Sequence, residues 1–257
     1  RVLVMADELL TEIRDRVMII TLNRPEAMNA VNIELARQMA AAMEELDANP
    51  DLSVGVITAN GRGFSAGMDL KAFVSGGMPN LPDRGFAGIA EMAADKPLIA
   101  AVEGFALAGG LEIALSCDLL VASKGAKLGI PEVGVGLFAG AGALSRLPRR
   151  VPYGLAMQMA LTGEPITAEV GHDFGLVQVL TEKGEALDGA LDLAARVAKN
   201  APLGLAASKR LIRDLGGIDG QFWGDQQPVL DRVFSSADAI EGATAFAEKR
   251  APNWTGK

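Results

Sequence analysis

Hydrophobic and polar residues follow two different periods along the first 180 residues. Short apolar runs bounded by turn residues predict strands at 9–15, 17–22, 53–59, 97–104, 118–122 and 126–130. Helical spacing predicts a helix from about Phe86 to Ala94, a short helix after Gly109-Gly110, and an amphipathic helix that follows Asn32 as its N-cap. One face of this last helix is formed by Leu35, Met39, Ala42, Met43 and Leu46. Strands that alternate with helices in this way predict an α/β fold.

The pattern changes near residue 186. The stretches "ALDGALDLAARVAKN" and "PLGLAASKRLIRDL", and a third stretch at 221–248, have helical spacing without a strand signal between them. We therefore expect a catalytic core over residues 1–185 and a C-terminal helical region over 186–257.

Charge and composition exclude several classes of function. The formal net charge is -8 and no block of Lys and Arg occurs, so nucleic acid is not an expected partner. No uncharged run reaches the about 18 apolar residues of a membrane-spanning helix. No signal peptide pattern opens the chain, and we expect a cytoplasmic protein in which "RVLV" before Met5 is an upstream extension.

Cysteine and histidine are each present once. Cys117 cannot form an internal disulfide, which fits a reducing compartment, and its apolar surroundings predict a buried, inert thiol. The single His172, on a short polar helix that ends at Gly175, is a poor basis for metal binding, so no metal is expected.

Two glycine-containing motifs suggest other chemistry. The segment "GVGLFAG" from Gly134 lacks the final glycine spacing and the acidic residue of a dinucleotide fingerprint. The segment "GFSAG" matches a nucleophile elbow, and chain order permits a triad of Ser65, Asp118 and His172. Against a hydrolase, "NGRG" separates this segment from the preceding strand, and no HGGG-type oxyanion segment occurs.

Two carboxylates stand in apolar surroundings without a neighbouring cation. Glu112 lies in the first turn of the helix that Gly109 and Gly110 open, where free N–H groups and the helix dipole favour negative charge. Glu132 follows a predicted strand, next to Pro131. The pair would form one site of coupled carboxylates with raised pKa values. Alternatively, each acid caps a helix or meets a distant cation such as Arg146.

The chain resembles the crotonase, or enoyl-CoA hydratase/isomerase, superfamily over nearly its whole length. The matching segments are "LNRPEAMNAVN", "GRGFSAGMDLKAF", "KPLIAAVEGFALAGGLEIALSCDLLVAS", "LGIPEVGVG", "LTGEPITAEVGHDFGLV" and "FAEKRAPNW", in this order. The resemblance implies a crotonase-like spiral of β-β-α units with a C-terminal helical trimerisation region. It also implies a homo-oligomer, either a trimer or a dimer of trimers.

The resemblance further implies an acyl-CoA thioester substrate, so coenzyme A is part of the substrate and no separate cofactor is expected. The carbonyl oxygen would accept from the N–H groups of Met68 and Gly109, and "GFSAG" would belong to a CoA-contacting loop. Members that hydrate 2-enoyl-CoA carry glutamates at both acid positions. Glu132 would exchange the Cα proton and Glu112 would orient and activate the water.

Other positions match segments that contact coenzyme A in this family. Contacts made largely through the backbone are expected from Ala27, Asn29, Ala30, Ala66, Asp69 and Leu70. Arg24 and Lys71 are cations that could meet the phosphates, and Lys249 matches a position near the nucleotide end.

The subfamily depends on weaker signals. "RGFAGIAE" and "EGATAFAEKRAPNWTGK" also resemble carnitinyl-CoA dehydratases, but a quaternary cation is usually held by an aromatic cage or acids, and the chain has one Tyr and two Trp. We therefore rank general 2-enoyl-CoA hydration first, with carnitinyl-CoA dehydratase and enoyl-CoA isomerase as alternatives on the same fold. A Ser65 hydrolase and a non-catalytic CoA-binding oligomer are the alternatives from other classes. Ala139 and Gly140 depart from the usual acyl-pocket loop, where Phe138 could shorten the pocket.

Overall fold

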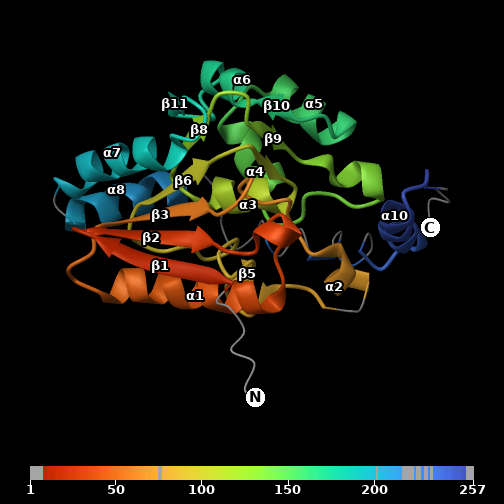
Figure 1. Cartoon of the computed structure of the whole chain (residues 1–257), viewed down its shortest axis with the longest axis horizontal. Coiled ribbons are helices and arrows are strands. Elements are labelled where there is room, and N and C mark those ends of the chain that lie inside the picture. The colour runs from red at the N-terminus through yellow and green to blue at the C-terminus, as the bar shows by residue number, and fades with distance from the viewer. Residues whose placement is uncertain are drawn as a thin grey trace.

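The structure, a computed structural model, describes residues 8–74, 77–200, 202–215 and 234–252, together with residues 223, 227, 228 and 231. The proposed extension at residues 1–4 lies outside them. Figure 1 shows a central sheet with helices on both sides, which confirms the α/β class.

The main sheet has six strands in the order β1-β2-β3-β6-β8-β11. β1 and β2 form an antiparallel hairpin around Asp15, whose φ is 54°, and all later neighbours are parallel. The strands are β1 Leu9–Arg14, β2 Val17–Leu22, β3 Val54–Ala59, β6 Leu98–Val102, β8 Leu119–Ser123 and β11 Val179–Thr181. The strands expected from the apolar runs at 9–15, 17–22, 53–59, 97–104 and 118–122 are thus confirmed.

A smaller sheet of order β10-β9-β7 and a two-stranded ribbon lie beside the main sheet. Their strands are β4 Asn80–Leu81, β5 Gly85–Phe86, β7 Phe105–Leu107, β9 Lys127–Gly129 and β10 Ile166–Thr167. β9 confirms the strand expected at 126–130. Parallel pairing of β7 with β9 ends at Leu107 and Gly129, just before the two segments that carry Glu112 and Glu132.

Helix α1, Ile33–Ala48, begins as expected at Asn32, whose Oδ1 accepts from the Leu35 N–H at 2.9 Å. Its apolar face is fully buried in one core cluster, while α7 covers the opposite face of the sheet (Figure 1). The other helices are α2 Leu70–Val74, α3 Gly109–Ser116, α4 Ala143–Arg146, α5 Tyr153–Thr162, α6 Ala168–Asp173, α7 Ala186–Ala198, α8 Pro202–Leu215 and α10 Ala237–Glu248. The described residues also form the 3₁₀ turns η1 Pro25–Ala27, η2 Pro131–Val135 and η3 Leu147–Arg149.

The helix expected from Phe86 to Ala94 is wrong: strand β5 is followed by turns. Gly85, Ala87 and Gly88 have φ values of 68°, 56° and 71°, which a right-handed helix does not tolerate. A Cβ on Gly88 would lie 2.2 Å from the Ala36 carbonyl oxygen, so this turn packs its backbone directly on α1. The helical spacing of apolar residues therefore gave a wrong prediction for 86–94, because close backbone contact with α1 decides the conformation there.

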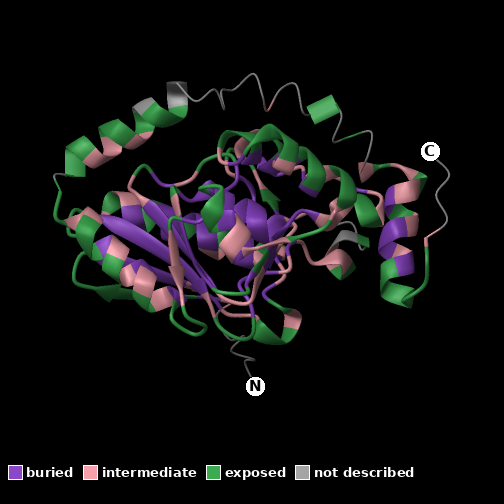
Figure 2. Cartoon of the chain, turned by 90° about the horizontal axis from the view of Figure 1, so that it is seen from above, coloured by how far each residue is buried: buried purple, intermediate pink, exposed green. Residues whose placement is uncertain are grey.

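The helices expected after residue 186 occur as α7, α8 and α10, although much of 216–233 lies outside the described residues. Ala186, Ala190 and Ala194 of α7 are fully buried against the main sheet. α10 contacts η2 and α2 at the opposite end of the molecule (Figure 1). Figure 2 shows burial concentrated in the central sheet and the helix beside it, whereas the outer helices are largely exposed. The division at 185 stays a prediction.

Candidate active site

Helix α3 begins at the edge of a cavity. Its N-cap, Ala108, has φ 52° and ψ -130°, an uncommon backbone conformation for a residue with a side chain, and its N–H donates to Gly129 O at 2.9 Å. Gly109 follows as the first residue of the helix. A Cβ there would lie 2.5 Å from Phe86 Cζ, so only glycine fits between the helix and this ring.

The loop that contains Gly67 and Met68 lies against the start of α3. A Cβ on Gly67 would lie 2.7 Å from the Gly109 nitrogen. Val31 N–H donates to Gly67 O at 2.7 Å and Asp69 N–H donates to Val31 O at 3.0 Å, so the intervening Met68 N–H points away from Val31. Within the described part of the chain, the N–H groups of Met68 and Gly109 have no acceptor. Two unpaired backbone donors thus lie on adjacent segments of the cavity wall.

Glu112 is held by the loop before α4. Its side chain is buried, with the residue 3% exposed, and Oε1 accepts from Ala141 N–H at 2.7 Å and from Ala143 N–H at 3.1 Å. Burial raises the pKa of Glu112 to about 7, although these two hydrogen bonds and the charge of Arg146 favour the ionised form. Oε2 accepts no hydrogen bond from the described residues, which leaves it for another partner.

Arg146 holds this loop in place. Its guanidinium donates to Ala141 O at 3.1 Å, to Ser116 Oγ at 3.3 Å and to Ala90 O, and it lies over the Trp223 ring, 5.8 Å from the centroid. Burial lowers the pKa of Arg146 to about 10. The sequence suggested Arg146 as a direct partner for the acids. In the structure Arg146 is a positioning residue, because it acts on Glu112 through its charge and through the loop.

Glu132 reaches the same cavity from η2. Its Oε2 is buried and accepts no hydrogen bond from the described residues. Burial, and then the charge of Glu112, raise the pKa of Glu132 to about 8. The alternative in which each acid meets a cation does not describe Glu132, which forms no salt bridge with the described residues. Its carboxylate interacts with its own backbone N–H in the first turn of η2, which lowers its pKa by a smaller amount than the other two causes raise it. The two carboxylates therefore titrate as a coupled pair.

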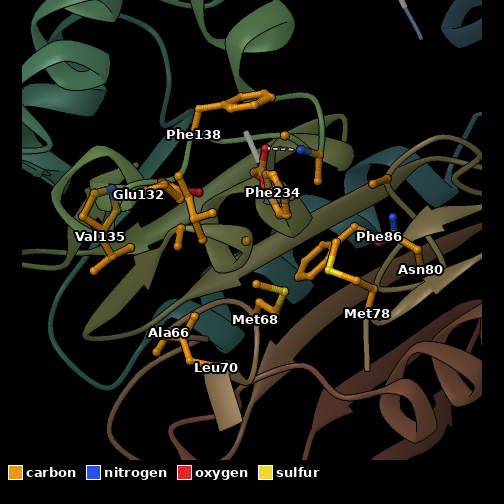
Figure 3. A pocket seen from close by; sticks show the side chains of 18 of the residues that line it. Ala66, Met68, Leu70, Met78, Asn80, Phe86, Glu132, Val135, Phe138 and Phe234 are labelled. Carbon is orange, nitrogen blue, oxygen red and sulfur yellow. Dashed lines mark hydrogen bonds between the residues drawn. The ribbon is translucent and has the colours of Figure 1, made fainter. Parts of the chain in front are cut away.

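The cavity has a volume of about 490 Å³ and a mostly apolar wall. Figure 3 shows Ala66, Met68 and Leu70 on one side of it, Glu132 with Val135 on another, and Phe138 opposite Met68. Such a space, with a few converging polar groups, is typical of a small-molecule site.

Arg24 and Asn29, expected to contact the ligand, hold loops together. Arg24 pairs with Glu8 and Asp69, each at 3.4 Å, and donates to Ala30 O. Asn29 is buried; its Nδ2 donates to Asn60 O at 2.8 Å and to Gly63 O at 3.0 Å. These side chains therefore shape the loop, and ligand contact here would come through the backbone.

The remaining anchoring positions separate into two groups. Ala66 and Leu70 line the cavity, and Asp69 Oδ1 accepts from the N–H groups of Lys71 and Ala72 at 3.1 and 3.3 Å at the start of α2. Besides Asp69, the residues outside the cavity lining are the half-buried Ala27 and Ala30, the exposed Lys71, and the exposed Lys249, which follows α10 with φ 55°. Their roles toward coenzyme A stay predictions.

The structure excludes Ser65 as a nucleophile. Ser65 is fully buried, and its hydroxyl donates to Asn29 O at 2.8 Å while it accepts from Gly67 N–H at 3.1 Å. Asp118 instead pairs with Lys209 at 2.8 Å, and His172 Nδ1 lies 2.9 Å from Val177 O. The triad that chain order permitted does not assemble.

The other reactive groups give no second site among the described residues. Cys117 is fully buried, as expected, and burial raises the pKa of its thiol to about 12. In the described part of the chain no group of three His, Cys, Asp or Glu residues could hold a metal ion. No helix there is long and apolar enough to cross a membrane.

Comparisons with known proteins identify the family of this chain. The family model described as enoyl-CoA hydratase/isomerase matches residues 12–257. The enoyl-CoA hydratase EchA19 of Mycobacterium tuberculosis is 40% identical over 255 residues, covering 95% of both chains. The 2,3-dehydroadipyl-CoA hydratase of Escherichia coli is 39% identical, covering 97% of this chain and 99% of its own. A crystal structure of carnitinyl-CoA hydratase from Mycobacterium avium superposes with a TM-score of 0.94 at 39% identity, covering 98% of this chain and all of its own.

Proposed function

The chain belongs to the enoyl-CoA hydratase/isomerase family and is an enzyme of the hydro-lyase type, and on that premise we propose that it adds water reversibly across the 2,3 double bond of a 2-enoyl-CoA thioester. The observation that carries this proposal is the meeting, at one cavity, of the buried Glu112 and the half-buried Glu132, both with raised pKa values, and two backbone donors that have no acceptor among the described residues.

The donors act on the thioester carbonyl. Its oxygen accepts from the N–H groups of Met68 and Gly109, and it gains negative charge as the enolate forms. On the precedent of other oxyanion holes, each preorganised donor is worth roughly 3 kcal/mol in the transition state. The dipole of α3 adds to this stabilisation, because Gly109 is the first residue of that helix.

The two acids divide the proton transfers. Glu112, fixed through Oε1, takes a proton from water as the water oxygen bonds to Cβ of the substrate. Glu132, whose pKa of about 8 keeps it mainly protonated at neutral pH, gives its proton to Cα of the enolate. Exchange with solvent then returns the proton from Glu112 to Glu132. Dehydration follows the same steps in reverse.

Hydration of crotonyl-CoA tests this proposal, followed as loss of the conjugated thioester absorbance. Glu112→Gln and Glu132→Gln should each lower kcat at least about a hundredfold, the usual contribution of a general acid or base. The control is Glu45→Gln, which alters an exposed glutamate on α1 and should leave kcat unchanged. Full kcat in either active-site variant would exclude the two-acid mechanism.

An enoyl-CoA isomerase is the second candidate, because it would need the donors and Glu132 without Glu112. The presence of both acids favours the hydratase. An isomerase would convert a 3-enoyl-CoA to its conjugated isomer with a gain of absorbance and would leave crotonyl-CoA unchanged. Binding of acyl-CoA without either conversion would indicate the non-catalytic alternative.

A dehydratase acting on carnitinyl-CoA is a third candidate, suggested by the name of the Mycobacterium avium relative. It would use the same donors and acids and would differ only in the acyl group. The acyl end of the cavity therefore has to distinguish it from general hydration.

We also propose that the protein works in the cytoplasm as a homo-oligomer, either a trimer or a dimer of trimers, with acyl-CoA as its partner and no separate cofactor. Large apolar side chains on the outer helices support assembly: Tyr153 and Leu161 on α5 are each 70% exposed, and Leu203 on α8 is 87% exposed. Sedimentation of the purified protein tests the oligomeric state.

A further inference from the structure

Ser65 is a buried hydroxyl residue that the proposed chemistry does not use. It is fully buried and lies behind the cavity wall rather than in its lining. The hydroxyl joins two buried residues, since it donates to Asn29 O at 2.8 Å and accepts from Gly67 N–H at 3.1 Å. Neither backbone group has another partner in the described part of the chain. Removal of the hydroxyl would therefore leave two polar groups in the interior without hydrogen bonds, which is costly.

The hydrogen bond from Gly67 helps to fix the direction of the Met68 N–H. Gly67 has φ 94°, and glycine rotates more freely about φ and ψ than other residues do. The Met68 N–H therefore keeps its direction only when the peptide groups on both sides of Gly67 are held. Val31 N–H holds the peptide group that follows, by donating to Gly67 O at 2.7 Å, and Ser65 Oγ holds the one that precedes.

The backbone of Ser65 contacts the segment that carries the second donor. Ser65 forms an isolated parallel bridge to β7, in which Leu107 N–H donates to Ser65 O at 3.0 Å. A Cβ on Gly110 would lie 2.2 Å from the same oxygen, so α3 begins directly against Ser65. Gly109, which provides the second N–H group, lies between these two contacts along the chain. One residue thus joins both segments that bring a donor to the cavity.

The acceptor of the Ser65 hydroxyl is itself held in place. The Asn29 side chain donates from Nδ2 to Asn60 O and Gly63 O, and its Oδ1 accepts from Arg24 N–H at 2.8 Å. These bonds fix a residue whose φ is 54°, a conformation that asparagine tolerates better than most residues. The hydroxyl of Ser65 therefore connects the donor pair to a rigid loop.

We propose that Ser65 is a positioning residue for the oxyanion hole, because its hydroxyl and its backbone together hold the N–H groups of Met68 and Gly109 in fixed directions. Donors that are fixed before the reaction stabilise the enolate without being reoriented during it. The effect belongs mainly to the transition state, since the enolate oxygen attracts the donors more strongly than the neutral carbonyl oxygen does. The proposal rests on the proposed function and adds a residue to the same site.

Truncation of the side chain tests the role of the hydroxyl. Ser65→Ala should lower kcat for crotonyl-CoA about tenfold and leave KM within about twofold of the wild type, because the loss is felt in the transition state. Ser65→Cys, whose thiol is a weaker donor and acceptor, should give an intermediate kcat. The matched control is Ser53→Ala, which removes a buried hydroxyl that accepts from Arg16 Nε at 2.8 Å and lies outside the cavity lining. Wild-type kcat in Ser65→Ala, or an equal loss in Ser53→Ala, would contradict the proposal.

A spectroscopic probe measures the two donors directly. Acetoacetyl-CoA gives up a Cα proton to solvent and becomes an enolate, whose ultraviolet absorption differs from that of the neutral thioester. The pKa of this ligand in the bound state reports how strongly the donors stabilise the enolate oxygen. Ser65→Ala should raise the pKa of bound acetoacetyl-CoA by about one unit, whereas the Kd of saturated butyryl-CoA should stay within about threefold of the wild type. An unchanged pKa of the bound ligand would overturn the proposal.

The same probe separates this inference from the proposed function. If crotonyl-CoA is not hydrated, the proposed function fails, yet a higher pKa of bound acetoacetyl-CoA in Ser65→Ala than in the wild type still supports the positioning role. If hydration occurs and both kcat and this pKa are unchanged in Ser65→Ala, the inference fails alone. The number of butyryl-CoA sites titrated in each sample corrects both measurements for partial loss of folded protein.

Discussion

The first turn of α3 and the 3₁₀ turn η2 each bring a glutamate to the same cavity, but they hold it differently. Glu112 is tied through Oε1 to two backbone N–H groups and lies within the field of Arg146. Glu132 has a buried oxygen that accepts no hydrogen bond from the described part of the chain, and the charge of Glu112 raises its pKa. Both carboxylates thus have raised pKa values, but the two N–H groups and Arg146 favour the ionised form of Glu112, whereas the charge of Glu112 favours the protonated form of Glu132.

The largest difference between the two glutamates should appear in the rate of proton exchange at Cα, measured in a reaction that does not involve the addition of water. Saturated butyryl-CoA in D₂O exchanges its Cα proton through Glu132 and the enolate, and no water is added. Glu132→Gln should slow this exchange about a thousandfold, whereas Glu112→Gln should stay within about tenfold of the wild type. Mass spectrometry of the recovered thioester measures the exchange. Equal reductions of the exchange rate in both variants would show that the two acids are interchangeable and would exclude separate roles for them.

The N–H groups of Met68 and Gly109 should contribute to kcat independently of Glu112 and Glu132. Gly67→Ala places a Cβ 2.7 Å from the Gly109 nitrogen at a φ of 94°, so it disturbs the donor pair without touching either carboxylate. We expect kcat for crotonyl-CoA to fall about a hundredfold while the shape of its pH profile is retained. Gly154→Ala is the control, because a Cβ there meets nothing within 4 Å. A changed pH profile would mean that donors and acids are not separate.

The smallest effect concerns the pH profile itself. Hydration needs ionised Glu112 and protonated Glu132, so kcat/KM, which reports the pKa values of the enzyme without substrate, should fall below about pH 7 and above about pH 8. The positive charge of Arg146 favours ionised Glu112, and its removal raises that pKa further. Arg146→Gln should therefore move the acid limb upward by about one pH unit, whereas Arg146→Lys keeps the charge and should leave the limb closer to the wild-type position. An acid limb that stays in place in Arg146→Gln would show that Arg146 acts only on the loop.

Local sequence predicted several of the elements and residues that the structure brings to the cavity or beside it. Asn32 predicted the start of α1, and Gly109 and Gly110 predicted the start of α3. Glu112 and Glu132 were identified as candidates because no cation lies near either of them in the sequence. Those features depend on neighbours along the chain, so a sequence carries them directly.

The other parts depend on contacts between distant segments. Phe86, Phe138 and Phe234 come from three separate regions, and only the fold gathers them at one cavity. The expected helix over 86–94 failed for a similar reason, since Gly88 packs on Ala36 of α1. The packing of α7 on the main sheet likewise depends on distant segments, since Ala186, Ala190 and Ala194 are buried against strands from the first half of the chain. Arg146 had no local signal for its contacts with Ala90 and Ser116.

Because main-chain N–H groups hold Glu112, the enzyme could acquire new substrates by substitutions that leave Glu112 in place. Ala141 and Ala143 hold the carboxylate through main-chain N–H groups, so these two hydrogen bonds do not depend on the side chains at positions 141 and 143. The same loop places Leu137 and Phe138 in the cavity wall, where the proposed function puts the acyl chain. Substitutions along this loop can therefore change substrate selectivity without removing the two hydrogen bonds to Glu112. Residues 137–140 are thus the first segment to randomise in a search for a variant that accepts another acyl group.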